Sequence, residues 1–327
     1  MPLTDTHGRT HDYLRISLTE RCNLRCTYCM PAEGVQLTPR SHLMTADELV
    51  AIASTFVEHG ITKIRLTGGE PLVRKDAADI ILRLSKLPVE LTLTTNALLV
   101  DRFIDTFKEA GIRSLNVSLD TLRPERFEHF TRRTGFEKTM ANIDLLIREG
   151  FRVKSNAVIL PGKNEDELLD FVRWTEHVPV HVRFIEFMPF DGNRWEWEKV
   201  FSYQQMLNVI GAELPYEKLQ DAKNDTAKAY RIPGYAGTFA VISSMTNHFC
   251  STCNRLRLTA NGNIRNCLFS DNEVDLLTPY RHGANILPLI QQSVAAKHAK
   301  HGGISELEQL SDGHPELPGR SMILIGG

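Results

Sequence analysis

The sequence predicts an α/β fold, in which a partial (β/α)6 barrel similar to a TIM barrel covers residues 1–190 and a β-rich extension covers residues 191–327. The first observation behind this prediction is an alternation of short β-rich runs with stretches of helical periodicity, which is typical of βαβ units and a parallel sheet. The second is that one face of each β-rich run is polar. The third is that the alternating pattern ends near residue 190.

Six β-rich runs lie in the first 190 residues and are expected to form parallel strands. They span residues 13–18, 61–67, 89–95, 112–120, 151–159 and 180–188. Helices are expected between the strands, at residues 47–60, 76–86, 101–110, 137–149 and 164–176. The stretch DELVAIASTFVEHG (47–60) illustrates the pattern, because its apolar residues recur at helical spacing and it stops at a glycine, as helix ends often do.

The strands carry a second signal in their alternation. Strands buried on both faces of a parallel sheet usually read as continuous apolar runs, whereas the run KIRLT (63–67) alternates Lys, Arg and Thr with Ile64 and Leu66. Since alternate residues share a face of a strand, each run has one polar face. If helices cover the outside, that face points inward and would hold a polar ligand. The alternative is an antiparallel sheet with one face in water.

The extension is expected to contain fewer helices. A helix is predicted at residues 202–210, and the polar stretch 216–230 is interpreted as a connection. Further predictions are strands at 228–232, 238–244 and 255–266, the last split by a turn at Asn261-Gly262, and a helix at 284–299.

Composition limits the classes of partner. The net charge is −2, so no nucleic-acid partner is expected and any anion site must be local. The first dozen residues contain no apolar signal region, and no apolar run approaches the length of a membrane span. These observations predict a cytoplasmic protein with no membrane partner.

Cysteine usage is the most specific feature of the sequence. All six cysteines fall into two groups of three, spaced C-x3-C-x2-C and C-x2-C-x13-C. In a large chain without a signal peptide, such groups favour metal binding over disulfides. Zinc sites and ordinary iron–sulfur clusters use four protein ligands, so each group is one ligand short. Zinc completed by His248 in the second group, and four-iron clusters with one open iron, both remain open. The groups are Cys22, Cys26 and Cys29, and Cys250, Cys253 and Cys267.

The first group resembles a known family. The segment C22-x3-C26-x-Y28-C29 is similar to the signature of radical S-adenosylmethionine (SAM) enzymes, and TGGEP (67–71) resembles that family's loop for the SAM amino group. The segment FCSTCNRLRLTANGNIRNCLF (249–269) resembles the GTP 3′,8-cyclases of molybdenum cofactor biosynthesis. This second resemblance extends from Arg15 to the Gly-Gly end of the chain.

The resemblance implies two [4Fe–4S] clusters, each held by one cysteine group, with SAM on the open iron of the first and the guanine base of GTP at the second. The implied cofactor contacts, to SAM, are Tyr28, Gly69, Ser118 and Met188. The implied substrate contacts are Arg15, Arg65, Thr94, Lys154, Arg255, Leu256 and Arg257. No single side chain is assigned as the catalytic group.

The resemblance also implies a reaction and its partners. SAM cleavage would give a radical that removes the ribose 3′ hydrogen of GTP, and ring closure at C8 would give (8S)-3′,8-cyclo-7,8-dihydroguanosine 5′-triphosphate, the first step of molybdenum cofactor biosynthesis. A one-electron reductant, and cyclic pyranopterin monophosphate synthase as acceptor of the product, are expected partners of a monomer or homodimer. An electron-transfer protein, a zinc-binding interaction module and a radical SAM enzyme acting on a peptide are the rival interpretations.

Position 97 and the C-terminal Gly-Gly pair are two further features of the sequence. The family commonly has Thr-Asn-Gly where this chain has Thr95-Asn96-Ala97, which raises a question about the loop if that position needs a positive φ. The Gly326-Gly327 end has three interpretations: a frayed terminus, a Gly-Gly end activated as an acyl adenylate, or, as in the resembled family, a tail that enters the active site.

Overall fold

The computed structural model describes residues 1–31, 33–191, 193, 195–270, 272–303 and 321–326. Its strands are β1 Leu3–Thr4, β2 Thr10–His11, β3 Tyr13–Ser17, β4 Lys63–Thr67, β5 Glu90–Thr95, β6 Ser114–Ser118, β7 Arg152–Ile159, β8 His181–Glu186, β9 Glu217–Lys218, β10 Ala227–Arg231, β11 Thr238–Ile242, β12 Arg255–Leu258, β13 Asn263–Arg265 and β14 Glu273–Asp275. Its α-helices are α1 Ala46–Glu58, α2 Ala77–Leu84, α3 Ile104–Glu109, α4 Pro124–Thr131, α5 Phe136–Arg148, α6 Leu168–Trp174, α7 Tyr203–Glu213, α8 Leu277–Arg281 and α9 Leu287–Ala295.

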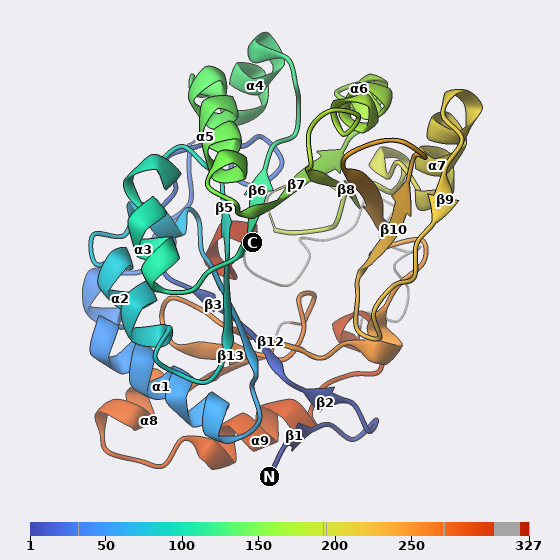
Figure 1. Cartoon of the computed structure of the whole chain (residues 1–327). Helices are drawn as coiled ribbons and strands as arrows, with labels where there is room; N and C mark the ends of the chain where they lie inside the picture. The colour runs from blue at the N-terminus through green and yellow to red at the C-terminus, as the bar shows by residue number, and fades with distance from the viewer. Residues whose placement is uncertain (32, 192, 194, 271, 304–320, 327) are drawn as a thin grey trace.

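One twelve-stranded mixed sheet organises the molecule, in the order β14-β13-β12-β3-β4-β5-β6-β7-β8-β11-β10-β9. The eight strands from β12 to β11 pair in parallel, and antiparallel hairpins extend both edges. The helices α1–α6 lie along the outside of the curved sheet, and the red segment Met322–Leu324 lies near its centre (Figure 1). The six strands expected before residue 190 are therefore confirmed as parallel, and the antiparallel alternative is wrong.

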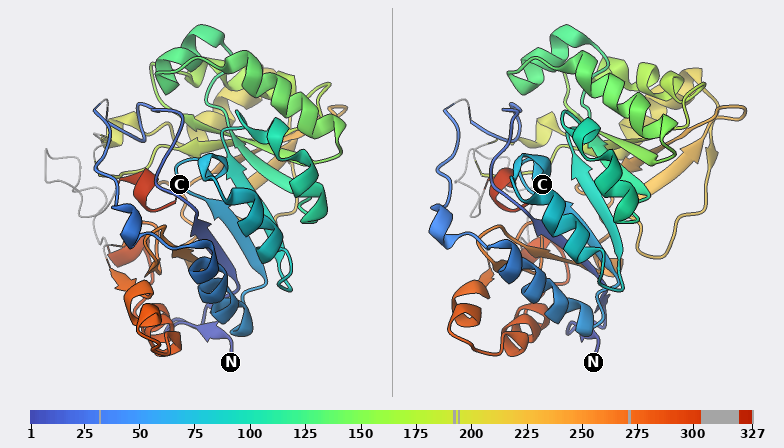
Figure 2. Two further views of the ribbon diagram at one scale, coloured as in Figure 1. Left: turned by 90° about the vertical axis from the view of Figure 1, so that its left-hand side faces the viewer. Right: turned by 60° about the vertical axis from the view of Figure 1, so that its left-hand side comes forward.

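The apolar residues of the strands pack outward against the helices. Leu14, Ile64 and Leu93 are completely buried in one large core together with the inner faces of α1 and α2. The side views show these helices lying against the sheet (Figure 2). The polar residues of the same strands must then point to the other side of the sheet, because side chains alternate along a strand.

Several elements differ from expectation. Helix α4 was not predicted, although Pro124 at its first turn is a common helix start. The stretch 216–230 contains two short strands, β9 and β10, in place of a plain connection. The helix expected at 284–299 is shorter in the structure. Helix α9 begins at Leu287, with a proline in its first turn, and ends at Ala295.

The sheet continues past residue 190. Strand β11 pairs with β8, and β12 pairs with β3, so the C-terminal part of the chain supplies strands to both sides of the N-terminal six. The domain boundary near residue 190 remains a prediction. No helix in the described ranges is both long enough and apolar enough to span a bilayer.

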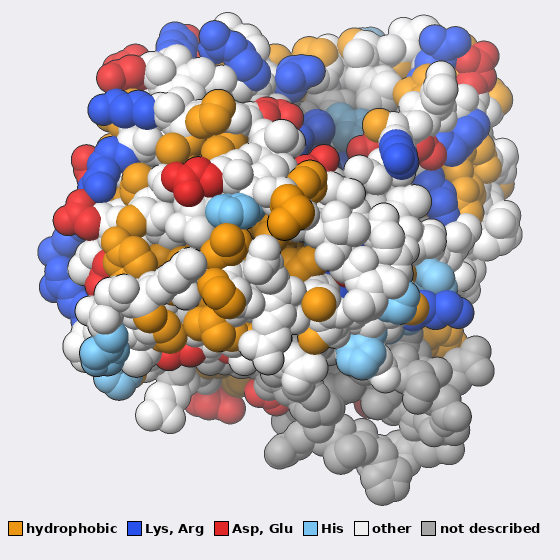
Figure 3. Space-filling model, turned by 90° about the horizontal axis from the view of Figure 1, so that it is seen from below, with side chains coloured by type: hydrophobic (Ala, Val, Ile, Leu, Met, Phe, Trp, Pro, Cys, Tyr) orange, Lys and Arg blue, Asp and Glu red, His pale blue; other side chains and the backbone are white. Residues whose placement is uncertain are grey.

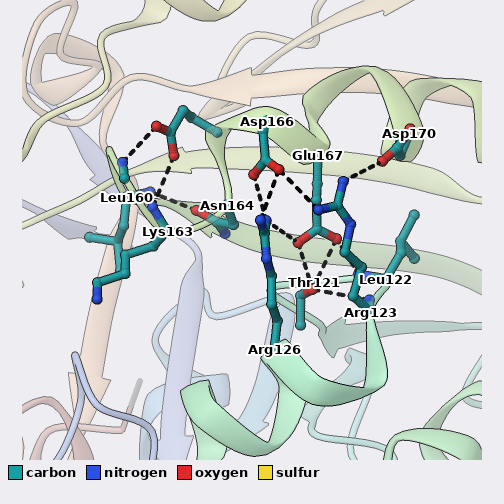
Figure 4. Close-up of polar contacts among 12 residues, drawn as sticks. Thr121, Leu122, Arg123, Arg126, Leu160, Lys163, Asn164, Asp166, Glu167 and Asp170 are labelled. Carbon is teal, nitrogen blue, oxygen red and sulfur yellow. Dashed lines mark hydrogen bonds and ion pairs between the residues drawn. The ribbon is translucent and has the colours of Figure 1, made fainter.

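A buried polar network ties together two loops at the carboxyl edge of the sheet (Figure 4). Glu167, whose side chain is fully buried, accepts hydrogen bonds from the Thr121 hydroxyl at 2.7 Å and the Leu122 amide at 2.7 Å. The Arg126 guanidinium donates to the same carboxylate at 2.9 Å. The network fixes the loop after β6 to the loop after β7.

We expect Glu167→Gln to lower the free energy of unfolding by about 2–3 kcal/mol, because the amide turns one acceptor into a donor facing buried donors. Asp170→Asn is the matched control, since Asp170 is partly exposed and pairs with the exposed Arg123 at 3.3 Å. That change should cost less than about 1 kcal/mol. Urea unfolding measures both values, and equal costs would contradict the assigned role of Glu167.

Candidate functional site

The polar faces of the strands line one cavity of about 670 Å³. Seven basic side chains from five strands contribute to its wall, and all lie on the face opposite the helices. They are Arg15, Lys63, Arg65, Lys154, Arg183, Arg255 and Arg257. Viewed from below, the surface is hollowed, and basic and histidine side chains are visible inside the hollow (Figure 3). The inward polar face expected from the sequence is therefore present.

Strand register places the basic side chains next to one another. Arg15 pairs in register with Arg257 on one side and with Arg65 on the other. Lys154 is paired with His181, and Asn156 with Arg183, on the far side of the cavity. Such a cluster without anions is unfavourable, because like charges repel and burial removes their hydration.

The pKa values of several basic side chains are lowered by this unfavourable arrangement. Burial, together with neighbouring cations, lowers the pKa of Arg15 to about 10, of Arg183 to about 9 and of Lys154 to about 8. Arg183 is only 8% exposed, and its Nε and Nη2 atoms have no hydrogen-bond partner among the described residues. A polyphosphate would supply the missing acceptors, since guanidinium groups match phosphate oxygens in geometry and charge.

The first cysteine group lies in the loop after β3, at the carboxyl edge of the sheet. Cys22, Cys26 and Cys29 are free thiols that line the same cavity. Burial raises the pKa of Cys22 to about 11 and of Cys29 to about 12, and the Cys22 thiolate would further raise the pKa of both Cys26 and Cys29. The three sulfur atoms thus face one buried space, as a shared cluster requires.

The TGGEP loop packs directly on this cysteine loop. Gly69 donates its amide to the Thr19 carbonyl at 2.8 Å, and Glu70 donates to the Arg21 carbonyl at 2.8 Å. A Cβ at Gly69 would lie 2.4 Å from the Arg21 oxygen, so only glycine permits this approach. The two motifs recognised in the sequence are therefore one structural unit.

The other positions with an implied SAM contact also line the cavity. Tyr28 donates its hydroxyl to Asp120 at 2.8 Å, and the second oxygen of Asp120 accepts from the Val158 amide at 2.9 Å. Ser118 and Met188 lie on the cavity wall. Thr94 does as well, and its hydroxyl has no hydrogen-bond partner in the described part of the chain.

The second cysteine group lies at the opposite edge of the sheet. Cys253 lies two residues before β12, whose first residue is in register with the start of β3, whereas the first group follows the end of β3. Burial and the neighbouring thiols raise the pKa of Cys250. Burial also opposes ionisation of Cys253, but Lys297 and Arg255 outweigh it and lower the pKa of Cys253.

The donor sets consist of thiols, the ligands that hold iron–sulfur clusters. In the described residues, no three His, Cys, Asp or Glu side chains are grouped closely enough for one metal ion. His248 is not grouped with the second cysteines in this way. Each group offers three free thiols, and three thiols suit a four-iron cluster with one iron open to a small molecule.

Leu256 differs from the other implied substrate contacts. Its side chain is completely buried in the core on the outer face of β12, because it alternates with Arg255 and Arg257. Only its backbone could contact a ligand.

Ala97 has a φ of 64°, so the position does adopt the backbone conformation that glycine prefers, and its buried methyl group offsets part of the strain.

The C-terminal tail enters the site. Met322 and Ile323 line the cavity, and the Gly326 carbonyl accepts a hydrogen bond from Arg257 at 3.0 Å. A Cβ at Gly326 would lie 2.8 Å from the Thr67 hydroxyl, so the tail fits because it lacks a side chain there. Gly327 lies outside the described residues. The tail position agrees with the third interpretation of the Gly-Gly end.

Sequence reasoning assigned no ligand or cluster contact to several basic residues of the site. Lys63 and Arg183 line the cavity, and Lys297 contacts the second cysteine group. The signal for Arg183 was present, because it alternates with apolar residues in the run VHVRFIEFM. Lys297 gave no signal, since it lies far along the chain from the cysteines it contacts.

His181 makes the stability of the protein sensitive to acid. Burial, followed by repulsion from Arg183 and Lys154, lowers its pKa to about 3. In the unfolded chain, histidine has a pKa of about 6.5, so the unfolded state takes up a proton below that pH while folded His181 stays neutral. The protein is therefore most stable above about pH 6.5, and it loses stability as the pH falls towards 3. We expect wild-type protein to lose about 1 kcal/mol more than His181→Gln between pH 7.5 and 5.5 in urea unfolding. His7→Gln, at an exposed position, should behave as wild type; equal pH slopes for wild type and His181→Gln would contradict this prediction.

Two family models match the chain. Residues 16–175 match the radical SAM superfamily, and residues 180–303 match the model described as Molybdenum Cofactor Synthesis C. Among solved structures, SuiB of Streptococcus suis bound to S-adenosylmethionine aligns over 84% of this chain and 67% of its own, with a TM-score of 0.58 and 15% identity. Native anSMEcpe with bound AdoMet aligns over 81% of this chain and 78% of its own, with a TM-score of 0.53 and 13% identity. These two likenesses concern the fold.

Curated relatives match almost the entire chain. Molybdenum cofactor biosynthesis protein 1 of Mus musculus is 50% identical over 99% of this chain, but the match covers 51% of the mouse protein. The chain thus spans about half the length of the first relatives it matches. The mitochondrial GTP 3′,8-cyclase of Arabidopsis thaliana is 47% identical, with 99% of this chain and 83% of the plant protein covered. The GTP 3′,8-cyclase of Peptoclostridium acidaminophilum is 43% identical, with 99% and 98% covered. The chain therefore belongs to the GTP 3′,8-cyclase family within the radical SAM superfamily.

Proposed function

We propose that this chain is a radical SAM lyase that converts GTP to (8S)-3′,8-cyclo-7,8-dihydroguanosine 5′-triphosphate, the first step of molybdenum cofactor biosynthesis. One observation carries the proposal. Two groups of three free thiols lie at opposite edges of the parallel part of the sheet, and a cavity to which the strands contribute seven basic side chains lies on the polar face between those edges.

The cavity suits a nucleoside triphosphate. The basic side chains of β3, β4, β7, β8 and β12 would bind and orient the triphosphate, and their mutual repulsion in the free protein favours that binding. Thr94 and Asn116 present buried oxygen atoms without partners among the described residues, and these suit ribose hydroxyls. Holding the ribose at a fixed distance from the cysteine loop is the principal contribution of the protein to the reaction.

The first cluster and SAM follow from membership of the radical SAM superfamily. Cys22, Cys26 and Cys29 would hold the cluster, and Gly69, Tyr28, Ser118 and Met188 would contact SAM. When bound, this pair supplies a 5′-deoxyadenosyl radical by one-electron reduction of SAM. The hydrogen bond between Tyr28 and Asp120 and the close glycine contact at residue 69 would keep the cysteine loop in place.

The second cluster, the barrel and the partners complete the proposal. Cys250, Cys253 and Cys267 would hold a second [4Fe–4S] cluster, next to which Arg255 and Arg257 would contact the substrate. The curved sheet would act as a partial (β/α)6 barrel over residues 1–190. A cytoplasmic protein of this kind needs a one-electron reductant, and cyclic pyranopterin monophosphate synthase would accept the product.

Anaerobic turnover tests the function. Purified protein with SAM, reductant and GTP should yield methionine, 5′-deoxyadenosine and the cyclic product, and it should contain about eight irons per chain. Cys253→Ala should retain about four irons and stop product formation. SAM cleavage without consumption of GTP would favour the peptide-modifying rival, and zinc without iron would exclude the enzyme.

A further inference from the structure

The segment after α9 lies against the second cysteine group. Lys297, whose residue is 3% exposed, donates its ammonium group to the Arg255 carbonyl at 2.8 Å and to the Cys253 sulfur at 3.5 Å. An ammonium group in this position has lost most of its hydration, which is costly without a negative partner. One carbonyl and one neutral thiol, a weak acceptor, do not compensate for that loss.

Arg9 joins the same segment to the loop that carries Cys250. Its guanidinium donates to the Cys250 carbonyl at 2.8 Å, to the Ala299 carbonyl at 3.0 Å and to the His298 carbonyl at 2.8 Å. Asp5, which is buried in the turn between β1 and β2, holds the Arg9 Nε at 2.6 Å. Figure 1 shows the β1–β2 hairpin beside α9.

These contacts connect three distant parts of the chain at one place. The N-terminal hairpin, the loop of residues 250–253 and the end of α9 meet where the second cluster would be held. Both cations sit on backbone carbonyls, so their positions do not depend on flexible surface contacts. A thiolate that ligates iron would give Lys297 the negative acceptor that a neutral thiol cannot provide.

We propose that Lys297 is a positioning residue that sets the reduction potential of the second cluster through its hydrogen bond to Cys253, with Arg9 holding the loop that carries the cluster. The inference rests on the second cluster of the proposed function. Hydrogen bonds to cluster sulfurs and nearby charge determine the potential of iron–sulfur centres. A fixed positive charge favours the reduced cluster, which carries one more negative charge.

The test uses the full chain with Cys22, Cys26 and Cys29 changed to alanine, so that any cluster signal comes from the second site. Lys297→Met removes the charge and the donor at nearly constant volume, and Lys297→Arg keeps both. Lys300→Met is the matched control, because Lys300 is exposed and lies three residues further along. Iron content, the electron paramagnetic resonance signal and the midpoint potential from an anaerobic redox titration are measured for each protein.

We expect the midpoint potential of the Lys297→Met protein to shift to a more negative value, while Lys297→Arg and Lys300→Met stay near the parent. Loss of iron in Lys297→Met with retention in Lys297→Arg would also support the role. Equal potentials for Lys297→Met and Lys300→Met would overturn it, as would equal loss of iron from both Lys297 variants. A parent protein without iron would instead show that the second cluster of the proposed function is wrong.

A second variant tests the contact between Arg9 and the loop that carries Cys250. Arg9→Met should leave the potential nearer to the parent value than Lys297→Met does, but it should release iron to a chelator several-fold faster, because the Cys250 carbonyl loses its donor. The rate of iron release from Arg9→Lys should fall between that of the parent protein and that of Arg9→Met. Unchanged release in Arg9→Met would contradict the part assigned to Arg9.

Discussion

Replacement of Cys26 by alanine is expected to abolish the cleavage of SAM, with 5′-deoxyadenosine formation at the background rate of a protein-free mixture. Cys26 is half-buried and lies close enough to Cys22 and Cys29 for their thiolates to raise its pKa, and no other cysteine in the described residues borders the first group. A four-iron cluster with two protein ligands would be lost or unable to present one defined open iron to SAM. Iron content should fall from about eight to about four per chain.

The loop around Cys26 should survive this change. The amides of Cys29 and Met30 donate to the Cys26 carbonyl, and the amides of Arg25 and Thr27 donate to the carbonyls of Thr131 and Phe130 in the last turn of α4. None of these bonds uses the thiol, so the cluster-free variant should unfold at the same urea concentration as cluster-free wild type. Cys253→Ala serves as the control, because it should still cleave SAM. Persistent 5′-deoxyadenosine in Cys26→Ala would refute the ligand assignment.

The framework of the sheet was predictable because its signal is local. Period-two alternation in runs such as KIRLT follows directly from burial on one side of a strand, and the helices between the runs have apolar stripes of helical period. The edges were less predictable. Strands β11 and β12 join the sheet beside β8 and β3, and such pairing over a long sequence separation leaves no local trace.

The residues of the site also differ in how far the local sequence predicts them. Cys22, Cys26 and Cys29 were identified because their spacing within one loop is itself the signal. Leu256 was assigned to the substrate together with its neighbours, but the alternation of β12 places its side chain in the core. Lys297 and Arg9 reach the second group from the end of α9 and from the N-terminal hairpin. Only a three-dimensional structure brings those residues together.

Arg183 offers a prediction in which stability and ligand binding change in opposite directions. Its side chain lies inside the cavity, with two guanidinium nitrogens that lack partners among the described residues. Burial, then repulsion from Arg65 and Arg15, lowers its pKa to about 9. The free protein therefore bears an uncompensated cost that a bound polyanion would remove.

We expect Arg183→Met to raise the free energy of unfolding of the free protein by about 1–3 kcal/mol, because a buried charge without full hydrogen bonding is replaced by an apolar side chain of similar length. The same change should raise the dissociation constant for GTP about 10- to 100-fold, the usual loss for one charge-assisted contact. Urea unfolding and anaerobic binding titrations measure the two quantities.

Arg152→Met is the matched control for this experiment, since Arg152 starts the neighbouring strand β7 with an exposed side chain. It should change neither quantity by more than about 0.5 kcal/mol. If Arg183 were instead a structural residue satisfied by its surroundings, Arg183→Met would destabilise the free protein. A loss of stability with unchanged GTP affinity would therefore reject the triphosphate site, because the cluster of like charges is favourable only if an anion is its normal occupant.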